Sequence, residues 1–109
     1  MSRADYEIAP EALRERLAAP NPPLLLDVRR HDEVAICALP GAVHLPMDEL
    51  QDRLGELDPG QETVVYCHHG VRSLSVTVFL RNQGFKSVSS LSGGIDRWSA
   101  LVDPSVPRY

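Results

Sequence analysis

The chain has 109 residues, 43% of them apolar and 24% charged, and a formal net charge of −4. This size and composition suit one self-sufficient core, so we expect a single domain over residues 1–109 and exclude disordered, collagen-like and coiled-coil proteins. The negative charge argues against a nucleic-acid-binding protein. No apolar stretch approaches the roughly 20 residues of a membrane span, and the N-terminus lacks a signal peptide's apolar segment. We therefore expect a cytoplasmic protein with neither a membrane nor a nucleic-acid partner.

The sequence contains two cysteines, Cys37 and Cys67, too few for a disulfide scaffold. Cys37 lies in the mixed apolar segment 34–39 and is expected to be a buried, unreactive thiol. Its alternative role is a resolving cysteine, which requires Cα atoms within about 7 Å of each other. No Cys/His set has the spacing of a zinc site, and adjacent histidines rarely point at one ion, so neither a metal nor another cofactor is expected.

Strand and helix patterns alternate along the chain. In chain order they predict a short edge strand over 6–8, a helix from Pro10 to before Pro20, a buried strand over 24–26, a strand over 42–45, a helix over 47–57, a strand over 63–66, a helix over 73–82, a strand over 87–91 and a helix over 95–101. A polar run, 27–33, follows the second strand. The alternation predicts an α/β fold with a mainly parallel sheet, whose sites form at the carboxyl ends of strands.

The sequence pattern also predicts where several individual side chains lie in the fold. The apolar positions Val71, Leu74 and Val78 are expected to form one face of the helix over 73–82. Gly84 is expected to cap that helix, Trp98 to be a core aromatic residue, and His44 to face solvent.

Cys67 follows the clearest strand of the sequence and precedes a helix. Unpaired N–H groups and the helix dipole at such a position favour a thiolate. Gly70 allows a positive φ, so that successive N–H groups can turn toward the sulfur, and Arg72 adds a permanent positive charge. No carboxylate side chain occurs between Thr63 and Ile95. Either most of this segment is buried in the core, or it creates a local electrostatic potential that suits an anion or a thiolate.

The segment Cys67-His68-His69-Gly70-Val71-Arg72 closely resembles the catalytic loop of rhodanese-like sulfurtransferases, in which the cysteine carries sulfane sulfur as a persulfide. Further blocks resemble that family's other motifs: 25–29 with Glu33, 39–42 with Pro46, and 91–95 with Trp98. The tail over 102–109 is similar to tails of rhodanese domains fused to enzymes that adenylate sulfur-carrier proteins. The sequence departs from many relatives in having Cys37-Ala38-Leu39 where they have Gly-His-Ile. No role of the family's histidine at this position is therefore carried over to this chain.

The resemblance implies a three-layer rhodanese-like fold with about five strands and thiosulfate-sulfurtransferase-like activity without a cofactor. A small anionic sulfur donor would load Cys67, and cyanide, a thiol or a sulfur-carrier protein would accept the sulfur. Cys67 is the expected catalytic residue. The expected substrate-binding residues, chiefly through their backbone N–H groups, are His68, His69, Gly70, Val71 and Arg72. Side-chain roles for His68 and His69 remain open.

The same resemblance implies that Asp27 and Arg29 support the loop. Glu33 is expected to pair with Arg29 or Arg30, and an exposed pair of this kind would stabilise little.

Two other functions remain open. The first is a non-catalytic regulatory or binding module, for which loss of the cysteine would be the expected mark. The second is a cysteine-dependent phosphatase or arsenate reductase of the same fold. Those enzymes have one more residue between cysteine and arginine, because a tetrahedral oxyanion needs a wider ring of N–H groups than a single sulfur does.

Overall fold

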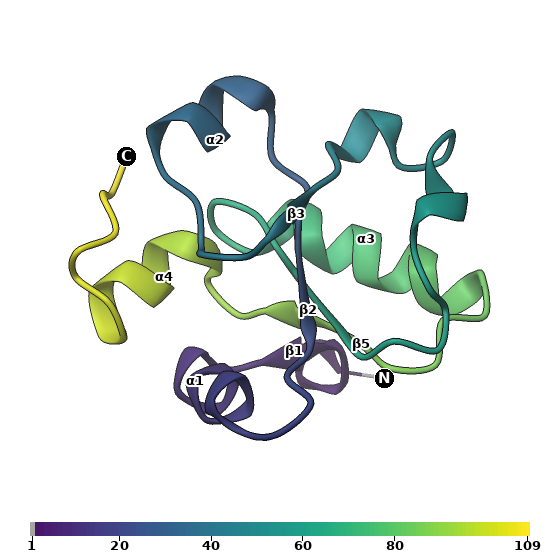
Figure 1. Ribbon diagram of the computed structural model, residues 1–109, viewed down its shortest axis with the longest axis horizontal. Coiled ribbons are helices and arrows are strands. Elements are labelled where there is room, and N and C mark those ends of the chain that lie inside the picture. The colour runs from purple at the N-terminus through teal and green to yellow at the C-terminus, as the bar shows by residue number, and fades with distance from the viewer. Residues whose placement is uncertain (1) are drawn as a thin grey trace.

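The computed structural model describes residues 2–109, which form a parallel sheet with helices on both of its faces (Figure 1). The strands are β1 (Glu7–Ile8), β2 (Leu24–Asp27), β3 (Val43–His44), β4 (Thr63–Tyr66) and β5 (Val88–Leu91). The α-helices are α1 (Pro10–Ala18), α2 (His31–Ile36), α3 (Val71–Asn82) and α4 (Gly94–Leu101). Short 3-10 helices are η1 (Arg3–Tyr6), η2 (Met47–Glu49) and η3 (Leu54–Glu56).

The five strands are ordered β1-β5-β4-β2-β3, and every neighbouring pair is parallel. The mainly parallel, five-stranded sheet and the edge position of the first strand are therefore confirmed. All four residues of β4 are buried because β2 and β5 flank it and helices cover both of its faces. The carboxyl end of this central strand leads directly to Cys67.

Two apolar clusters lie on opposite faces of the sheet. Along β4, Val65 belongs to the cluster that contains α3 residues, whereas Val64 belongs to the cluster that contains residues of α1 and α4. Figure 1 shows α3 on one side of the sheet and α1 with α4 on the other. The chain thus has the three layers expected of this α/β fold.

The sheet also separates the two cysteines. Cys67 is 1% exposed and belongs to the cluster on the α3 face, whereas the buried Cys37 belongs to the opposite cluster. Both are free thiols. This arrangement supports an inert Cys37 and gives no support to a resolving role.

Two helix predictions are wrong. The single helix expected over 47–57 is instead η2 and η3 joined by turns, and Gly55, a poor helix former, lies within η3. The polar run after β2 contains α2, which the sequence pattern did not predict. Its N-terminus is stabilised by Glu33, whose side chain accepts a hydrogen bond from the N–H of Arg30 at 3.1 Å.

The apolar face predicted for α3, with Val71 and Val78, is not the face that packs on the sheet. Val71 is 67% exposed and Val78 37% exposed, whereas Ser73, Val76, Thr77 and Leu80 are buried. Two of these buried residues are polar and satisfied internally. The Thr77 hydroxyl donates to the Ser73 carbonyl at 2.8 Å, and the Ser73 hydroxyl pairs with that of Ser90 at 2.7 Å.

Two other predicted environments, those of Gly84 and Trp98, are confirmed. Gly84 follows α3 with a φ of +91°, and Trp98 is buried between α4 and the sheet. No helix within residues 2–109 is long and apolar enough to cross a membrane.

Candidate active site

The sulfur of Cys67 lies within the turn that connects β4 to α3. The N–H groups of Gly70 and Ser73 point to Sγ at 3.2 and 3.3 Å. Gly70 is the N-cap of α3 and has a φ of +96°, which turns its N–H toward the sulfur. Two N–H dipoles aimed at a buried sulfur at a helix N-terminus favour negative charge on that sulfur.

Ser73 is a site residue that the sequence reasoning missed. Its hydroxyl oxygen lies 3.4 Å from Sγ and pairs with the Ser90 hydroxyl on β5. Ser73 therefore contacts the sulfur through both its backbone and its side chain, one residue beyond the predicted span. The available signal was its place directly after Arg72, at the start of the predicted helix over 73–82.

The loop is packed tightly against the N-terminus of α4. The N–H of Ile95 donates to the Cys67 carbonyl at 2.9 Å, and the N–H of Asp96 donates to the His68 carbonyl at 3.1 Å. Gly94 makes this approach possible because a Cβ at its position would overlap both carbonyl groups. The Gly93-Gly94 pair after β5 therefore positions the loop that carries Cys67.

Arg72 forms a bidentate ion pair with Glu33. Its Nη1 and Nη2 atoms donate to the two carboxylate oxygens at 2.6 and 2.9 Å. The Arg72 hydrogen bonds lower the pKa of Glu33 far below its ordinary value, against the effect of its burial. The expected pair with Arg30 is present, with Arg30 Nη1 3.6 Å from Glu33 Oε1. Its expected exposure is wrong for the carboxylate, because Glu33 is 3% exposed and its bidentate partner is Arg72.

Asp27 and Arg29 form a buried ion pair beside the loop. Arg29 Nη2 lies 2.7 Å from the Asp27 carboxylate, and both residues are at most 1% exposed. Burial alone would lower the pKa of Arg29, but hydrogen bonds with Asp27 and Tyr109 outweigh it and raise that pKa. Arg29 also donates to the Cys37 carbonyl at 2.7 Å. This pair joins the end of β2 to the segment after α2.

His44 does not simply face solvent. Its ring is half-buried, and Nε2 donates to the Arg29 carbonyl at 2.7 Å. The prediction failed because β3 lies beside the end of β2, where this carbonyl is available.

His68 and His69 differ in their surroundings. The His69 side chain is 61% exposed, and its Nδ1 lies 4.0 Å from the Asp96 carboxylate. The half-buried His68 ring stacks on that of Tyr109 with centroids 3.8 Å apart and planes 6° apart. The tail therefore reaches the loop that carries Cys67, a contact that local sequence pattern does not predict.

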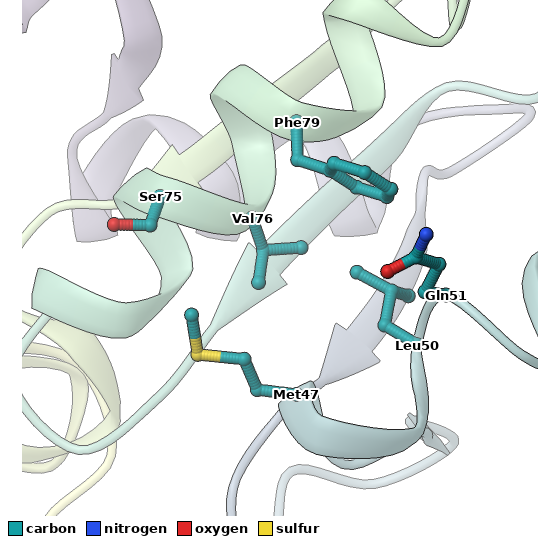
Figure 2. A pocket seen from close by; sticks show the side chains of 6 residues that line it. All are labelled: Met47, Leu50, Gln51, Ser75, Val76 and Phe79. Atoms are coloured by element: carbon teal, nitrogen blue, oxygen red, sulfur yellow. The ribbon is translucent and has the colours of Figure 1, made fainter.

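Open surface adjoins the loop. Arg72 lines a shallow pocket together with Val28, Arg30, Pro46, Met47 and Asp48. Met47 also borders an apolar groove, in which Figure 2 shows Met47 and Leu50 facing Val76 and Phe79 of α3. The exposed Val71 begins the same helix. The site thus combines a buried sulfur, an arginine at a pocket, and apolar surface beside them.

Comparison with known proteins places this architecture in a family. The rhodanese-like domain profile matches residues 9–101. "Putative sulfurtransferase YtwF" of Bacillus subtilis is 38% identical over 98 residues, covering 90% of this chain and 94% of that protein. "Rhodanese-like/PpiC domain-containing protein 12, chloroplastic" of Arabidopsis thaliana is 42% identical over 89 residues, which cover 78% of this chain but 30% of that protein.

One longer relative aligns with nearly the whole of this chain. "Adenylyltransferase and sulfurtransferase uba4" of Ogataea parapolymorpha is 30% identical over 112 residues, covering 98% of this chain and 28% of that protein. Among solved structures, a rhodanese-related protein from Thermoplasma volcanium has a TM-score of 0.83 and 27% identity, covering 95% of this chain and 99% of its own. The matched residues 9–101 include β2 to β5 and the loop that carries Cys67, and the chain belongs to the rhodanese-like domain family.

Proposed function

We propose that residues 1–109 act as one sulfurtransferase domain, which moves sulfane sulfur from a donor such as thiosulfate to a thiophilic acceptor through a persulfide on Cys67. The observation that carries the proposal is the Cys67 sulfur, held at a helix N-terminus by the N–H groups of Gly70 and Ser73. The names of relatives such as YtwF support sulfur transfer in general. Thiosulfate as the donor and the acceptors named below are part of this proposal.

The first step is a displacement on sulfur. The Cys67 thiolate attacks the outer sulfur of thiosulfate and forms a new S–S bond. The original S–S bond of the donor breaks, and its electron pair leaves with sulfite. Charge balances, since a monoanion and a dianion become a persulfide monoanion and sulfite, and no oxidant is consumed.

The second step restores the thiolate. A nucleophilic acceptor attacks the outer sulfur of the persulfide, and the S–S electron pair returns to Cys67. Cyanide would take up the sulfur and leave as thiocyanate, and a thiol would become a new persulfide. The name of a further relative, "Putative sulfur carrier protein YrkF" of Bacillus subtilis, supports a sulfur-carrier protein as a further acceptor. The two free thiols of the chain are consistent with the reducing cytoplasm as its location.

The loop backbone is the main substrate-binding element in this proposal. The other N–H groups from His68 to Arg72 would surround the outer persulfide sulfur, while those of Gly70 and Ser73 hold the inner one. Arg72 would bind the anionic donor, because its guanidinium has N–H groups beyond the two that Glu33 occupies and its side chain is 31% exposed. In this proposal, the buried pair of Asp27 and Arg29 at the end of β2 supports the loop. No step requires a metal or an organic cofactor.

Phosphate or arsenate chemistry is the second candidate. Its support is limited to the fold and the cysteine-arginine loop, and the shorter loop here favours sulfur. A non-catalytic binding module is the third candidate, and the intact Cys67 with its two N–H donors counts against it.

Steady-state kinetics test the proposal and separate the three candidates. Initial rates of thiocyanate formation are measured over a grid of thiosulfate and cyanide concentrations for the wild type, Cys67→Ser and Cys37→Ser. We expect parallel double-reciprocal lines for the wild type and Cys37→Ser, and no turnover for Cys67→Ser. Hydrolysis of a phosphate ester without thiocyanate formation would favour a phosphatase, and no turnover of either substrate would favour a binding module.

A further inference from the structure

Tyr109 is placed against the catalytic loop although it lies 80 residues from Arg29 and 76 from Glu33 in the sequence. Its hydroxyl donates to Glu33 Oε2 at 2.8 Å and accepts from Arg29 Nη1 at 2.9 Å. Its ring stacks on His68, and the Arg29 guanidinium lies 5.8 Å from the ring centroid. One side chain therefore contacts Arg29 after β2, Glu33 in α2 and His68 in the loop.

The tail that carries Tyr109 is fixed by contacts of its own. Val106 is buried in the core, and its carbonyl accepts from the Ser99 hydroxyl at 2.5 Å. Arg108 pairs with the Asp96 carboxylate at 2.9 and 3.1 Å. Asp96 also donates its N–H to the His68 carbonyl, so the tail and the loop share one support on α4. The position of Tyr109 thus follows from packing on both sides.

The hydroxyl of Tyr109 connects to Arg72 through Glu33. The same oxygen, Oε2, accepts from Tyr109 at 2.8 Å and from Arg72 Nη2 at 2.9 Å. Fixing this carboxylate fixes the plane in which the guanidinium must lie, because a bidentate pair is directional. Burial raises the pKa of Tyr109 to about 12, against the effect of the Arg29 hydrogen bond. The hydroxyl therefore keeps the proton that it donates to Glu33 throughout the neutral range.

We infer that Tyr109 is a positioning residue of the active site, whose hydroxyl orients Arg72 through Glu33 and whose ring orients His68. The inference rests on the proposed function, in which Arg72 binds the anionic sulfur donor. Tyr109 makes no contact with the reacting sulfur and acts only through these two residues. Its removal should impair donor binding more than the chemical steps.

Three variants separate the hydroxyl from the ring and from general effects. Tyr109→Phe removes the hydroxyl and keeps the stack, whereas Tyr109→Ala removes both. Tyr6→Phe is the matched control: it makes the same change in a ring that packs against Arg81, near the far end of α3. KM for thiosulfate and kcat are measured for each, together with NMR signals of the Arg72 Nε–H group and the His68 ring.

For Tyr109→Phe we expect KM to rise roughly threefold to tenfold, the scale of one ordinary hydrogen bond, because the hydroxyl acts on Arg72 only through Glu33, with kcat within about twofold of wild type. The Arg72 signal should shift and the His68 signal should stay. Tyr109→Ala should move both signals and raise KM further. Tyr6→Phe should match the wild type in all four quantities.

Two results would overturn the inference. One is a Tyr109→Phe variant whose KM and Arg72 signal equal those of the wild type. The other is equal loss of kcat and kcat/KM with unchanged KM, which indicates a structural effect on the active fraction. A wild type that forms no persulfide contradicts the proposed function instead, and the NMR signals then still decide whether Tyr109 positions Arg72 and His68.

Discussion

Arg72 and Glu33 lie 39 residues apart in the sequence and form a bidentate ion pair at the mouth of the catalytic loop. Glu33 lies in the first turn of α2 and Arg72 in the first turn of α3. Their pairing joins the segment after β2 to the segment after β4, which are neighbouring strands of the sheet. The carboxylate thus holds the one loop cation in a fixed orientation beside the buried thiol.

Glu33→Gln should lower the free energy of unfolding at neutral pH by about 2 kcal/mol, the scale of charge-assisted hydrogen bonds. The pKa of Glu33 is depressed in the folded protein, so its stabilising effect is complete above its ordinary value of 4.5 and declines as the pH falls below it. Urea unfolding of both proteins from pH 7 downward would measure this difference.

Glu56→Gln is the matched control for that experiment, because Glu56 is 56% exposed and pairs with Arg53 on the surface. Its effect should be about 0–1 kcal/mol. A Glu33→Gln destabilisation that stayed constant or grew as the pH fell would contradict the role of the ionised carboxylate.

Arg72→Lys should raise KM for thiosulfate by about tenfold while kcat changes less, because an ammonium group cannot keep the bidentate pair and also face the donor. Initial-rate kinetics would measure both constants. Arg14→Lys, at an exposed position on α1, is the control and should leave both unchanged. An unaltered KM in Arg72→Lys would show that the donor does not use this guanidinium.

Asp27→Asn should destabilise the fold by about 3 kcal/mol, since it leaves the buried Arg29 guanidinium without its charged partner. Thermal unfolding would detect this as a lower Tm, while turnover per folded molecule should remain. A variant with wild-type Tm and little turnover would assign Asp27 a direct part in the reaction.

Gly94→Ala should destabilise the fold by more than about 3 kcal/mol and abolish turnover, because its Cβ would overlap the carbonyls of Cys67 and His68. Gly84→Ala isolates the cost of the backbone conformation: Gly84 also has a positive φ, yet nothing lies within 4 Å of its added Cβ. That control should cost about 1–2 kcal/mol. Equal effects of the two substitutions would remove steric packing as the explanation.

The sequence predicted the parts of the site that depend on local order. β-Branched residues indicated β4, and the cysteine, glycine and arginine that follow indicated a loop leading into a helix. These residues act within one short segment, so their spacing carries the geometry. The order of strands and helices likewise predicted a parallel sheet, because parallel neighbours require crossover connections.

The parts that failed depend on distant partners. Hydrophobic periodicity selected Val71 and Val78, but internal hydrogen bonds allow α3 to bury Ser73 and Thr77 instead. A six-residue helix such as α2 is too short to show a clear period. Local pattern also could not reveal that Glu33 meets Arg72 or that Tyr109 returns to the loop, since packing of the whole fold sets these contacts.

The most direct measurement is intact-protein mass spectrometry of the wild type and Cys67→Ser after incubation with thiosulfate in the absence of reductant, followed by cyanide. The account predicts that the wild type alone gains one sulfur and that cyanide removes it. If neither thiosulfate nor a persulfide donor adds sulfur to the wild type, or if Cys67→Ser gains sulfur equally, Cys67 is not the sulfur carrier and the proposed function is contradicted.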